Sequence, residues 1–289
     1  MTRVLVVRNS EGSGPRRLGG WLADAGVTAD VVPAWEGLPD RLDGYDGVVL
    51  LGGGYLPDDD AEHPWLPRER ALTAEALDRG TPLLGICLGE QLLAHVAGGE
   101  VTARSGETER GMCALEVLPE AAGDPLLGQF MTGGGQAGAA PGNGPGVPVP
   151  GRMPAGHVLA DRTADPRNDP VADRVADRDA APTAVVPEPL WMLENHEDSV
   201  TALPPGATLL VTSPECRVQA FRVGRAAWGL QFHPEAPPDA ILRWDEAALA
   251  GQGLDRAALA SAAQERADQN TTQSRALIHS WTKMLRSVQ

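Results

Sequence analysis

The hydrophobic residues of the first third of the chain form short runs. Longer amphipathic stretches lie between these runs. Four runs are apolar or β-branched at almost every position and end near Gly, Pro or Asn: residues 3–7, 28–32, 47–53 and 82–86. Continuous runs of this length are typical of strands that are buried on both faces of a parallel sheet. We therefore predict four parallel strands, with a further strand over 111–118 near an edge of the sheet.

Helical periodicity fills the stretches between these strands. Residues 16–26, 64–80 and 88–99 place apolar side chains at helical spacing, and the last two stretches stop at Gly. Strands that alternate with helices in this way predict a doubly wound, mostly parallel α/β sheet of the Rossmann or flavodoxin-like kind. We expect residues 1–289 to form a single domain around this sheet.

The pattern fails in the middle of the chain. Of the 55 residues from 128 to 182, 18 are Gly or Pro, and Phe130 is the only aromatic residue. This share lies above the roughly 25–30% at which an aperiodic segment is of low complexity. We expect residues 128–182 to form a disordered insertion, and a surface loop is favoured over a regulatory or docking element.

Ordered structure is predicted to return after the insertion. Residues 189–213 are expected to form a strand and a loop. A β-hairpin is predicted over 218–232, with a Gly-Arg turn between two β-branched and aromatic runs. From residue 244 to residue 289, Ala-rich and Leu-rich periodic sequence predicts a C-terminal extension of two helices, separated near 251–253.

Charge and cysteine content exclude several classes of protein. The chain has 24 Lys and Arg against 39 Asp and Glu, a formal net charge of −15, and no basic cluster that could neutralise a run of phosphates. No stretch approaches the roughly 20 apolar residues of a membrane span, and the N-terminus lacks the apolar core of a signal peptide. We expect a cytoplasmic protein that binds neither nucleic acid nor membrane. Three cysteines without C-x-x-C spacing predict no disulfide framework, no metal site and no cofactor.

Cys87 lies at the carboxyl end of the strand predicted over 82–86, where open α/β sheets bind their ligands. Gly85 and Gly89 flank it in a Gly-x-Cys-x-Gly pattern, which leaves room for the tight, strained turn called a nucleophile elbow. The N-terminus of the helix predicted over 88–99 favours the thiolate form. A free cysteine is usually a small buried hydrophobic residue, but these features favour a nucleophile.

A thiol nucleophile needs a base, and the chain has six histidines. Four are excluded by their position in the insertion, in an acidic loop, eight residues along the helix from the cysteine, or in the terminal helix: His157, His63, His95 and His279. His196 and His233 remain. His233 follows the second strand of the predicted hairpin, and Glu235 lies two residues further on. In a Cys-His-acid arrangement such a carboxylate orients the imidazole toward the thiol.

The segments GICLGEQLLA (85–94) and GLQFHPE (229–235) together resemble the class I, triad-type, glutamine amidotransferases. The resemblance covers residues 1–127 and about 185–240, and it is closest to the amidotransferase domain of GMP synthases and their stand-alone relatives, because of the segment WMLENHEDSVTALPPGATLL. These enzymes release ammonia from glutamine through a γ-glutamyl thioester and need no cofactor. The resemblance implies Cys87 as the nucleophile, His233 as the base and Glu235 as the residue that orients it.

The resemblance also implies a set of substrate contacts. Backbone N–H groups of Gly53 or Gly54 and of Leu88 would form the oxyanion hole. Gln91, four residues after the nucleophile, resembles the family position that holds the amino and carboxylate end of glutamine. The remaining positions implied to bind substrate are Gly52 and His196.

Two loops depart from the family pattern. The family loop commonly reads Gly-Gly-Pro and a small polar residue, whereas this chain has Gly54, Tyr55 and Leu56. The Ser-His-Gly-Asp loop of GMP synthases reads Asn-His-Glu-Asp here, with Glu197 in place of glycine. Both loops lie where they would contact the leaving group of the substrate or a docked partner.

Two functions follow as expectations. The first is a glutaminase or amidotransferase that passes ammonia to a partner, an ammonia-acceptor enzyme. We expect such a partner because no G-x-x-x-x-G-K-[ST] motif is present and too few residues follow Glu235 for an ATP-using synthase domain. The alternative is a stand-alone hydrolase of γ-glutamyl peptides or amides that uses the same triad. A non-catalytic binding protein would have no reason to keep all three triad residues.

Overall fold

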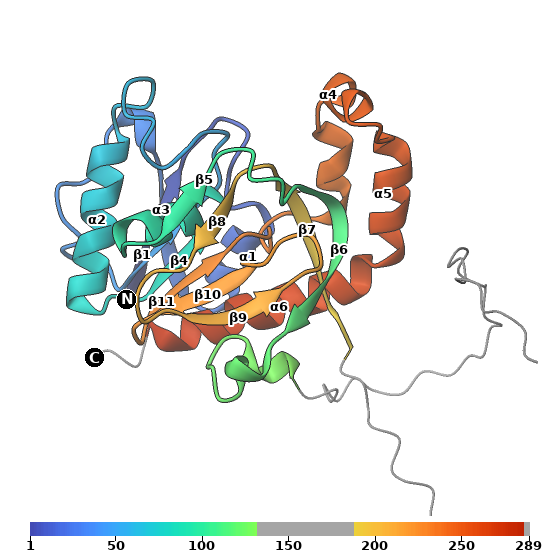
Figure 1. The fold of residues 1–289 in the computed structure, drawn as a ribbon. Coiled ribbons are helices and arrows are strands. Elements are labelled where there is room, and N and C mark those ends of the chain that lie inside the picture. Colours follow the sequence, from blue (N-terminus) through green and yellow to red (C-terminus); the bar gives the residue numbers. More distant parts are fainter. Residues whose placement is uncertain (132–187, 286–289) are drawn as a thin grey trace, which may run out of the picture. The chain divides into compact units, whose positions relative to one another are not determined.

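A nine-stranded sheet runs through the described part of the chain, residues 1–131 and 188–285 of this computed structural model (Figure 1). In spatial order its strands are β2 (Val27–Pro33), β1 (Thr2–Arg8), β3 (Gly47–Leu50), β4 (Leu83–Ile86), β11 (Ala227–Leu230), β10 (Ala220–Val223), β9 (Thr208–Thr212), β6 (Glu109–Val117) and β7 (Leu190–His196). The first five strands are parallel, and every pair from β11 to β7 is antiparallel. A separate antiparallel pair consists of β5 (Glu100–Thr102) and β8 (Ser199–Ala202).

Six α-helices and four short 3-10 helices accompany these strands in the described residues. The α-helices are α1 (Arg16–Asp24), α2 (Leu66–Arg79), α3 (Leu88–Val96), α4 (Glu246–Gly251), α5 (Arg256–Glu265) and α6 (Ala267–Met284). The 3-10 helices are η1 (Ala34–Glu36), η2 (Pro119–Ala121), η3 (Gly128–Phe130) and η4 (Pro238–Arg243).

Both faces of the parallel strands are covered by helices. In β1, Val4 and Val6 pack in a cluster with side chains of α1 and α6, whereas Leu5 and Val7 pack in a second cluster with side chains of α2 and α3. Figure 1 shows these two helix layers on opposite sides of the sheet. Because successive side chains of a strand point to opposite faces, burial on both faces explains the continuous apolar runs of the sequence.

The predicted α/β arrangement is confirmed for the first part of the chain. The four predicted strands form β1 to β4, the three predicted helices form α1 to α3, and β6 lies next to the edge strand β7. The predicted hairpin is β10 and β11, and β11 pairs in parallel with β4, so that Leu230 lies opposite Ile86. This pairing brings the chain after β11 to the same end of the sheet as the chain after β4.

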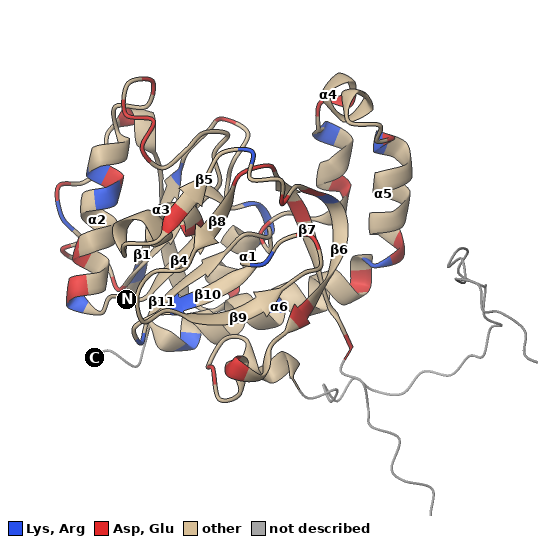
Figure 2. Cartoon of the chain, viewed as in Figure 1, with Lys and Arg blue, Asp and Glu red and all other residues tan. Residues whose placement is uncertain are grey.

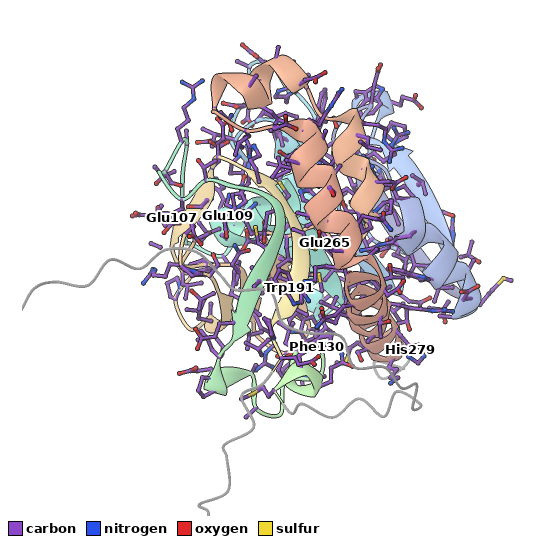
Figure 3. All side chains as sticks on the ribbon, turned by 90° about the vertical axis from the view of Figure 1, so that its right-hand side faces the viewer. Glu107, Glu109, Phe130, Trp191, Glu265 and His279 are labelled. Carbon is purple, nitrogen blue, oxygen red and sulfur yellow. The ribbon has the colours of Figure 1, made fainter. Side chains whose placement is uncertain are left out.

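Two predictions for the second half of the chain were too simple. Residues 189–213 form three strands, β7, β8 and β9, in place of one strand and a loop. The C-terminal extension has three α-helices, because the chain changes partners near Arg266: α5 packs against β6, and α6 packs against α1 and β7. The side view of Figure 3 shows α5 beside β6. Asp side chains cap α4 and α5 at their first turns.

The segment after η2 stays ordered for a few residues beyond the predicted boundary of the insertion. Gly128–Phe130 forms η3, and the half-buried Phe130 packs against the core on the α1 and α6 side of the sheet. The rest of the predicted insertion, from 132 to 182, lies outside the described residues. Figure 2 shows basic and acidic positions interspersed along α2 and at the ends of α5. None of the helices in the described ranges has the length and apolar character required to cross a bilayer.

Candidate active site

Cys87 is the single residue between β4 and α3. Its backbone has φ 55° and ψ −111°, a conformation that non-glycine residues rarely adopt. The Cys87 N–H donates to the carbonyl of Leu230 on the neighbouring β11, at 2.8 Å. Such a strained turn between a strand and a helix is what a nucleophile elbow requires, since it directs the side chain out of the end of the sheet.

The two glycines of the elbow are required by close backbone contacts. A Cβ atom on Gly85 would lie 2.3 Å from the carbonyl oxygen of Gly89, and a Cβ atom on Gly89 would lie 2.2 Å from the carbonyl oxygen of Leu50. Neither contact is compatible with a side chain, because both partners are backbone atoms. The predicted role of Gly85 and Gly89 in the geometry of the elbow is confirmed.

His233 and Glu235 lie at the same end of the sheet. The His233 N–H donates to the carbonyl of Leu193 on β7, at 2.9 Å, and its Nδ1 is 2.8 Å from Oε1 of Glu235. A Cβ atom on Gly52 would contact both Cε1 of His233, at 3.4 Å, and Sγ of Cys87, at 3.8 Å. The thiol, the imidazole and the loop after β3 therefore meet around one small volume.

The protonation of His233 is set by its neighbours. Burial by itself would lower the pKa of His233, but the charge of Glu235, a side-chain hydrogen bond with Cys87 and the hydrogen bond with Glu235 raise this pKa well above its ordinary value. These neighbours therefore favour the protonated form of the imidazole. An imidazolium next to a cysteine stabilises the thiolate, which is the nucleophilic form of the residue.

Arg17 fixes the short segment that carries the histidine and the glutamate. Its Nε donates to the carbonyl of Pro234 at 2.9 Å, and its Nη2 donates to Asn270 at 2.7 Å and to Ser274 at 2.9 Å, both on α6. Burial lowers the pKa of Arg17 to about 10, against the raising effect of Glu235. Arg17 thus ties α1, α6 and the His-Pro-Glu segment together and acts as a positioning residue.

A cavity of about 770 Å³ opens above these side chains. It is lined by the loop after β1, the loop after β3, the elbow, β7 and the segment from His233 to Trp244: Ser10, Glu11, Gly12, Ser13, Arg16, Gly52, Gly53, Gly54, Cys87, Leu193, Asn195, His233, Glu235, Ala236, Ala240, Arg243 and Trp244. Cys87, His233 and Glu235 all belong to this lining. The cavity therefore offers a bound molecule simultaneous access to a thiol and an imidazole.

Residues 16–123 match the sequence model of glutamine amidotransferase class-I. Residues 16–123 therefore carry the sequence pattern of the class I glutamine amidotransferases. Solved structures of the same fold include a glutamine amidotransferase from Thermotoga maritima, with a TM-score of 0.70, 24% identity and 98% of both chains covered. Another is a glutamine amidotransferase from Methylobacillus flagellatus, with a TM-score of 0.69, 20% identity, and 98% of this chain and 95% of that chain covered.

Curated relatives of the chain include two kinds of enzyme. A GMP synthase (glutamine-hydrolyzing) from Aeropyrum pernix is 40% identical over 99 residues, which are 34% of this chain and 18% of the relative. Gamma-glutamyl peptidase 5 from Arabidopsis thaliana is 24% identical over 194 residues, which are 67% of this chain and 55% of the relative. The match therefore spans about half the length of the peptidase and about a fifth of the GMP synthase.

The elbow at Cys87 brings most of the predicted site residues together. Gly52, Gly53 and Gly54 line the cavity next to Cys87. Leu88 is the first residue of α3, where a helix N–H has no partner within the helix. Among the hydrogen bonds of the described residues, the N–H groups of Gly53 and Gly54 donate to no protein acceptor. These N–H groups are free to bind a ligand.

Two predicted substrate-binding residues lie outside the cavity lining. Gln91 is 3% exposed, and its Nε2 donates to the carbonyl of Asp198 and to Oε1 of Gln231, each at 3.2 Å. His196 is buried at the end of β7, where it faces other polar side chains. The structure does not bring either side chain to the cavity, because internal hydrogen bonds hold Gln91 and because His196 points to the opposite face of β7 from Asn195.

The structure adds residues that no sequence motif indicates. Arg16, with φ 42°, donates from Nη2 to the carbonyl of Gly12 at 2.9 Å and lines the cavity. Arg243, the last residue of η4, and Trp244, which follows it, also line the cavity. Their only sequence signal is that a cationic and an aromatic residue are adjacent after the His-Pro-Glu segment, which is too common to indicate a site.

Proposed function

We propose that this chain hydrolyses the side-chain amide of glutamine through a thioester on Cys87. The thiolate Sγ attacks the side-chain carbonyl carbon, and the carbonyl oxygen becomes an oxyanion that accepts hydrogen bonds from the N–H groups of Gly53 or Gly54 and Leu88. The C–N bond then breaks, and the leaving ammonia takes the proton of His233. Water, deprotonated by His233, attacks the thioester and releases glutamate.

The observation that carries this proposal is the convergence of three groups on one cavity. The thiol of the strained elbow, the imidazole of His233 and the Oε1 atom of Glu235, 2.8 Å from Nδ1, meet where the backbone N–H groups of the Gly52–Gly54 loop have no protein acceptor in the described ranges. Acyl transfer requires a nucleophile, a base that a third group orients, and hydrogen-bond donors for the oxyanion, all within reach of one substrate atom.

The ammonia is proposed to pass to an acceptor enzyme. The GMP synthase relative is named as glutamine-hydrolyzing, and its 40% identity over 99 residues is the higher of the two identities quoted above. A chain that delivers ammonia to an acceptor enzyme is expected to hydrolyse glutamine slowly when no acceptor is present, because the ammonia would otherwise be lost. We therefore expect the isolated chain to hydrolyse glutamine slowly, and to hydrolyse it faster with its acceptor enzyme bound at the mouth of the cavity.

A second candidate function is the hydrolysis of γ-glutamyl peptides. The volume of about 770 Å³ lies within the range of roughly 300–1,000 Å³ that holds drug-sized ligands, which are much larger than glutamine. Arg16, Arg243 and Trp244, which line the cavity, would contact the peptide part of such a substrate. The relative from Arabidopsis thaliana is a gamma-glutamyl peptidase, which is consistent with this candidate.

The two candidates are separated by the substrate preference of the purified chain. Release of glutamate would be measured from glutamine and from a panel of γ-glutamyl dipeptides, with Cys87→Ala as the blank. We expect slow hydrolysis of glutamine and a lower kcat/KM for the dipeptides. If the dipeptides had a kcat/KM higher by about tenfold or more, a difference of about 1.4 kcal/mol, the peptidase function would replace the first proposal.

A further inference from the structure

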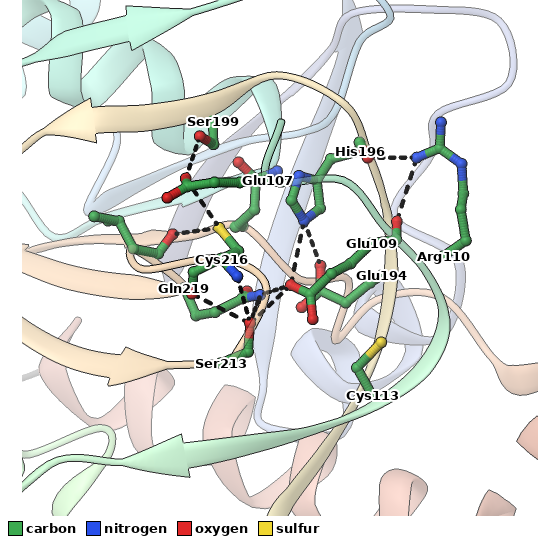
Figure 4. Close-up of polar contacts among 12 residues, drawn as sticks. Glu107, Glu109, Arg110, Cys113, Glu194, His196, Ser199, Ser213, Cys216 and Gln219 are labelled. Carbon is green, nitrogen blue, oxygen red and sulfur yellow. Dashed lines mark hydrogen bonds and ion pairs between the residues drawn. The ribbon is translucent and has the colours of Figure 1, made fainter. Parts of the chain in front are cut away.

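A second group of polar side chains is buried where β6 begins and β7 ends, outside the lining of the cavity. It consists of Glu109, Glu194, His196 and Cys216, and we call it the β6–β7 cluster (Figure 4). Figure 3 shows Glu109 near the start of β6. In the antiparallel pair, Glu109 lies opposite His196, and Glu194 precedes His196 by two residues, so all three side chains share one face. Cys216 comes from the loop between β9 and β10.

The potential ligand atoms of this cluster lie close together. Nε2 of His196 is 3.6 Å from Oε2 of Glu109 and 3.6 Å from Oε2 of Glu194. The ligand atoms of Glu109, His196 and Cys216 all lie within 4.8 Å of one another. A tetrahedral zinc site with bonds of about 2.0–2.3 Å has edges of roughly 3.3–3.8 Å, so small shifts would bring these atoms to bonding positions.

One tautomer of His196 suits a metal ligand. Nδ1 is 3.3 Å from the carbonyl oxygen of Asp198 and donates to it in the tautomer that carries the proton on Nδ1. In the neutral imidazole Nε2 then has a free lone pair, and this buried atom has no hydrogen-bond partner among the described residues. A lone pair that faces two carboxylates is repelled unless a proton or a cation lies between them. Metal-binding histidines commonly donate their other N–H to a carbonyl in this way.

The carboxyl groups of the cluster have histidines, and no Lys or Arg, as their basic neighbours among the described residues. Neither oxygen of Glu194 has a hydrogen-bond partner in the described ranges, and no Lys or Arg of those ranges forms an ion pair with Glu109 or Glu194. The nearby Arg110 instead binds Glu197 and the backbone carbonyl of His196.

We propose that Glu109, Glu194, His196 and Cys216 bind one zinc ion. The donor set is one nitrogen, one sulfur and two carboxylate oxygens, and zinc accepts all three donor types in tetrahedral sites. Four protein ligands would close the coordination sphere, so the ion is structural and takes no part in the hydrolysis. When the Zn–S bond forms, the S–H bond of Cys216 breaks and its proton passes to solvent.

The position of the cluster gives the ion a role in holding β7. The ligands come from β6, β7 and the β9–β10 loop, and on the other face of β7 Asn195 lines the cavity. The carbonyl of Leu193 on β7 accepts the N–H of His233. A zinc ion bound by all these elements would therefore fix the strand that supports the base. No C-x-x-C spacing marks the site, because its ligands lie far apart in the sequence.

The test is metal binding by the full chain after treatment with a chelator. Zn²⁺ would be titrated in competition with a chromophoric chelator, and Co²⁺ would be used as a spectroscopic probe for a thiolate-to-metal band. We expect one Zn²⁺ per chain and a Co²⁺–thiolate band in the unmodified chain. Both should be retained in Cys87→Ala, which removes the active-site thiol, and in Cys113→Ser, which removes the cysteine of β6.

Loss of a ligand should abolish these signals. Because even residues that support a ligand contribute about 10–100-fold to metal affinity, we expect Cys216→Ser and His196→Gln to weaken Zn²⁺ binding by about 100-fold or more. Cys216→Ser should also remove the Co²⁺–thiolate band while leaving the far-ultraviolet circular dichroism of the metal-free chain unchanged. This nearly isosteric change keeps the test decisive if His196→Gln does not fold.

Three outcomes would overturn the proposal. They are the absence of stoichiometric Zn²⁺ binding by the folded chain, a thiolate band that survives in Cys216→Ser, and a band that disappears in Cys87→Ala. The last result would place the metal at the active site instead. None of these measurements depends on the hydrolytic activity of the chain, so failure of the zinc proposal and failure of the proposed function are distinguishable.

Discussion

Cys87 and Cys216 are both buried cysteines, yet their surroundings give them different chemistry. Cys87 is 8% exposed, lines a cavity and interacts with the imidazole of His233, whose pKa is raised by Glu235 and by Cys87 itself. Cys216 is 0% exposed, and burial together with the acidic groups Glu90, Glu107 and Glu194 raises the pKa of its thiol. A thiol near a positive charge and a cavity suits nucleophilic attack, whereas a thiol among buried carboxyl groups stays protonated unless a cation replaces its proton.

The elbow at Cys87 and the β6–β7 cluster around Cys216 are also stabilised by different interactions. Backbone atoms in van der Waals contact fix the elbow, since Gly85 and Gly89 have no room for a Cβ atom. Polar contacts fix the β6–β7 cluster: Ser213 Oγ donates to Glu109 at 3.0 Å, and Gln219 also donates to this carboxylate. A steric site is sensitive to added volume, and a polar site is sensitive to charge, so different substitutions test each.

The largest expected effect is on the reactivity of the two thiols. Cys87→Ala should lower glutamine hydrolysis by at least about 10⁴-fold, because loss of a nucleophile removes the covalent route. A glutamine-like electrophile should label Cys87 and leave Cys216 and Cys113 unmodified in the folded chain, as read by peptide mass spectrometry. Cys113→Ser is the matched control and should keep its activity. Equal labelling of all three thiols would contradict the distinction between the two regions.

The next effect concerns Glu235, which raises the pKa of His233. Glu235→Gln should lower kcat by up to roughly 10⁴-fold, since the orientation of the imidazole and the charge beside it are disturbed. Because the imidazolium must give its proton to ammonia, activity falls as the pH rises through the pKa of His233. The alkaline limb of kcat/KM should therefore move to lower pH in the variant.

The control for this change is Glu265→Gln, on the exposed surface of α5, which should leave the pH profile unchanged. An alkaline limb that stayed in place in Glu235→Gln would mean that Glu235 does not set the protonation of His233. The triad assignment would then have to be revised.

A smaller effect is expected from adding one methyl group at the elbow. Gly89→Ala should destabilise the chain by about 3 kcal/mol or more, because the new Cβ atom would overlap the Leu50 carbonyl and overpacking against backbone cannot relax. Gly20→Ala, in α1, is the matched control, since no atom lies within 4 Å of its Cβ position. This control should be neutral or stabilising by up to about 1 kcal/mol. Urea denaturation of both variants measures the difference, and equal stabilities would show that the elbow is not sterically fixed.

The contrast between the elbow, which local sequence determines, and the β6–β7 cluster, which tertiary pairing determines, also explains which features the sequence predicts. The strands β1 to β4 and the elbow follow from local runs and from two glycines next to a cysteine, so they are visible in a few consecutive residues. Strand β5 has only three residues, and the break at Arg266 depends on which neighbour each helix contacts, so neither has a local signal. Arg17 and the β6–β7 cluster depend on tertiary pairing alone.

The smallest expected effect comes from a buried carboxyl group on the elbow side of the molecule. Glu69 is 0% exposed, and Asn9, which also donates to the carbonyl of Leu51, is its hydrogen-bond donor at 2.9 Å. Burial raises the pKa of Glu69 from 4.5 to about 7, against the lowering effect of that hydrogen bond. The folded state therefore prefers the protonated form. The resulting stability is complete below the unfolded pKa and is lost as the pH rises through about 7.

Glu69→Gln does not titrate, and its amide oxygen can still accept from Asn9. Relative to this variant, the unmodified chain should lose on the order of 2 kcal/mol of unfolding free energy between about pH 5 and about pH 7.5. The exposed Glu62→Gln is the control and should show no such pH dependence. If the difference in stability between the unmodified chain and Glu69→Gln did not change with pH, the ionised carboxylate of Glu69 would be stable in its buried site without a cation. The same conclusion would then weaken the argument from unpaired buried carboxyl groups in the β6–β7 cluster, and the zinc titration would have to stand on its own.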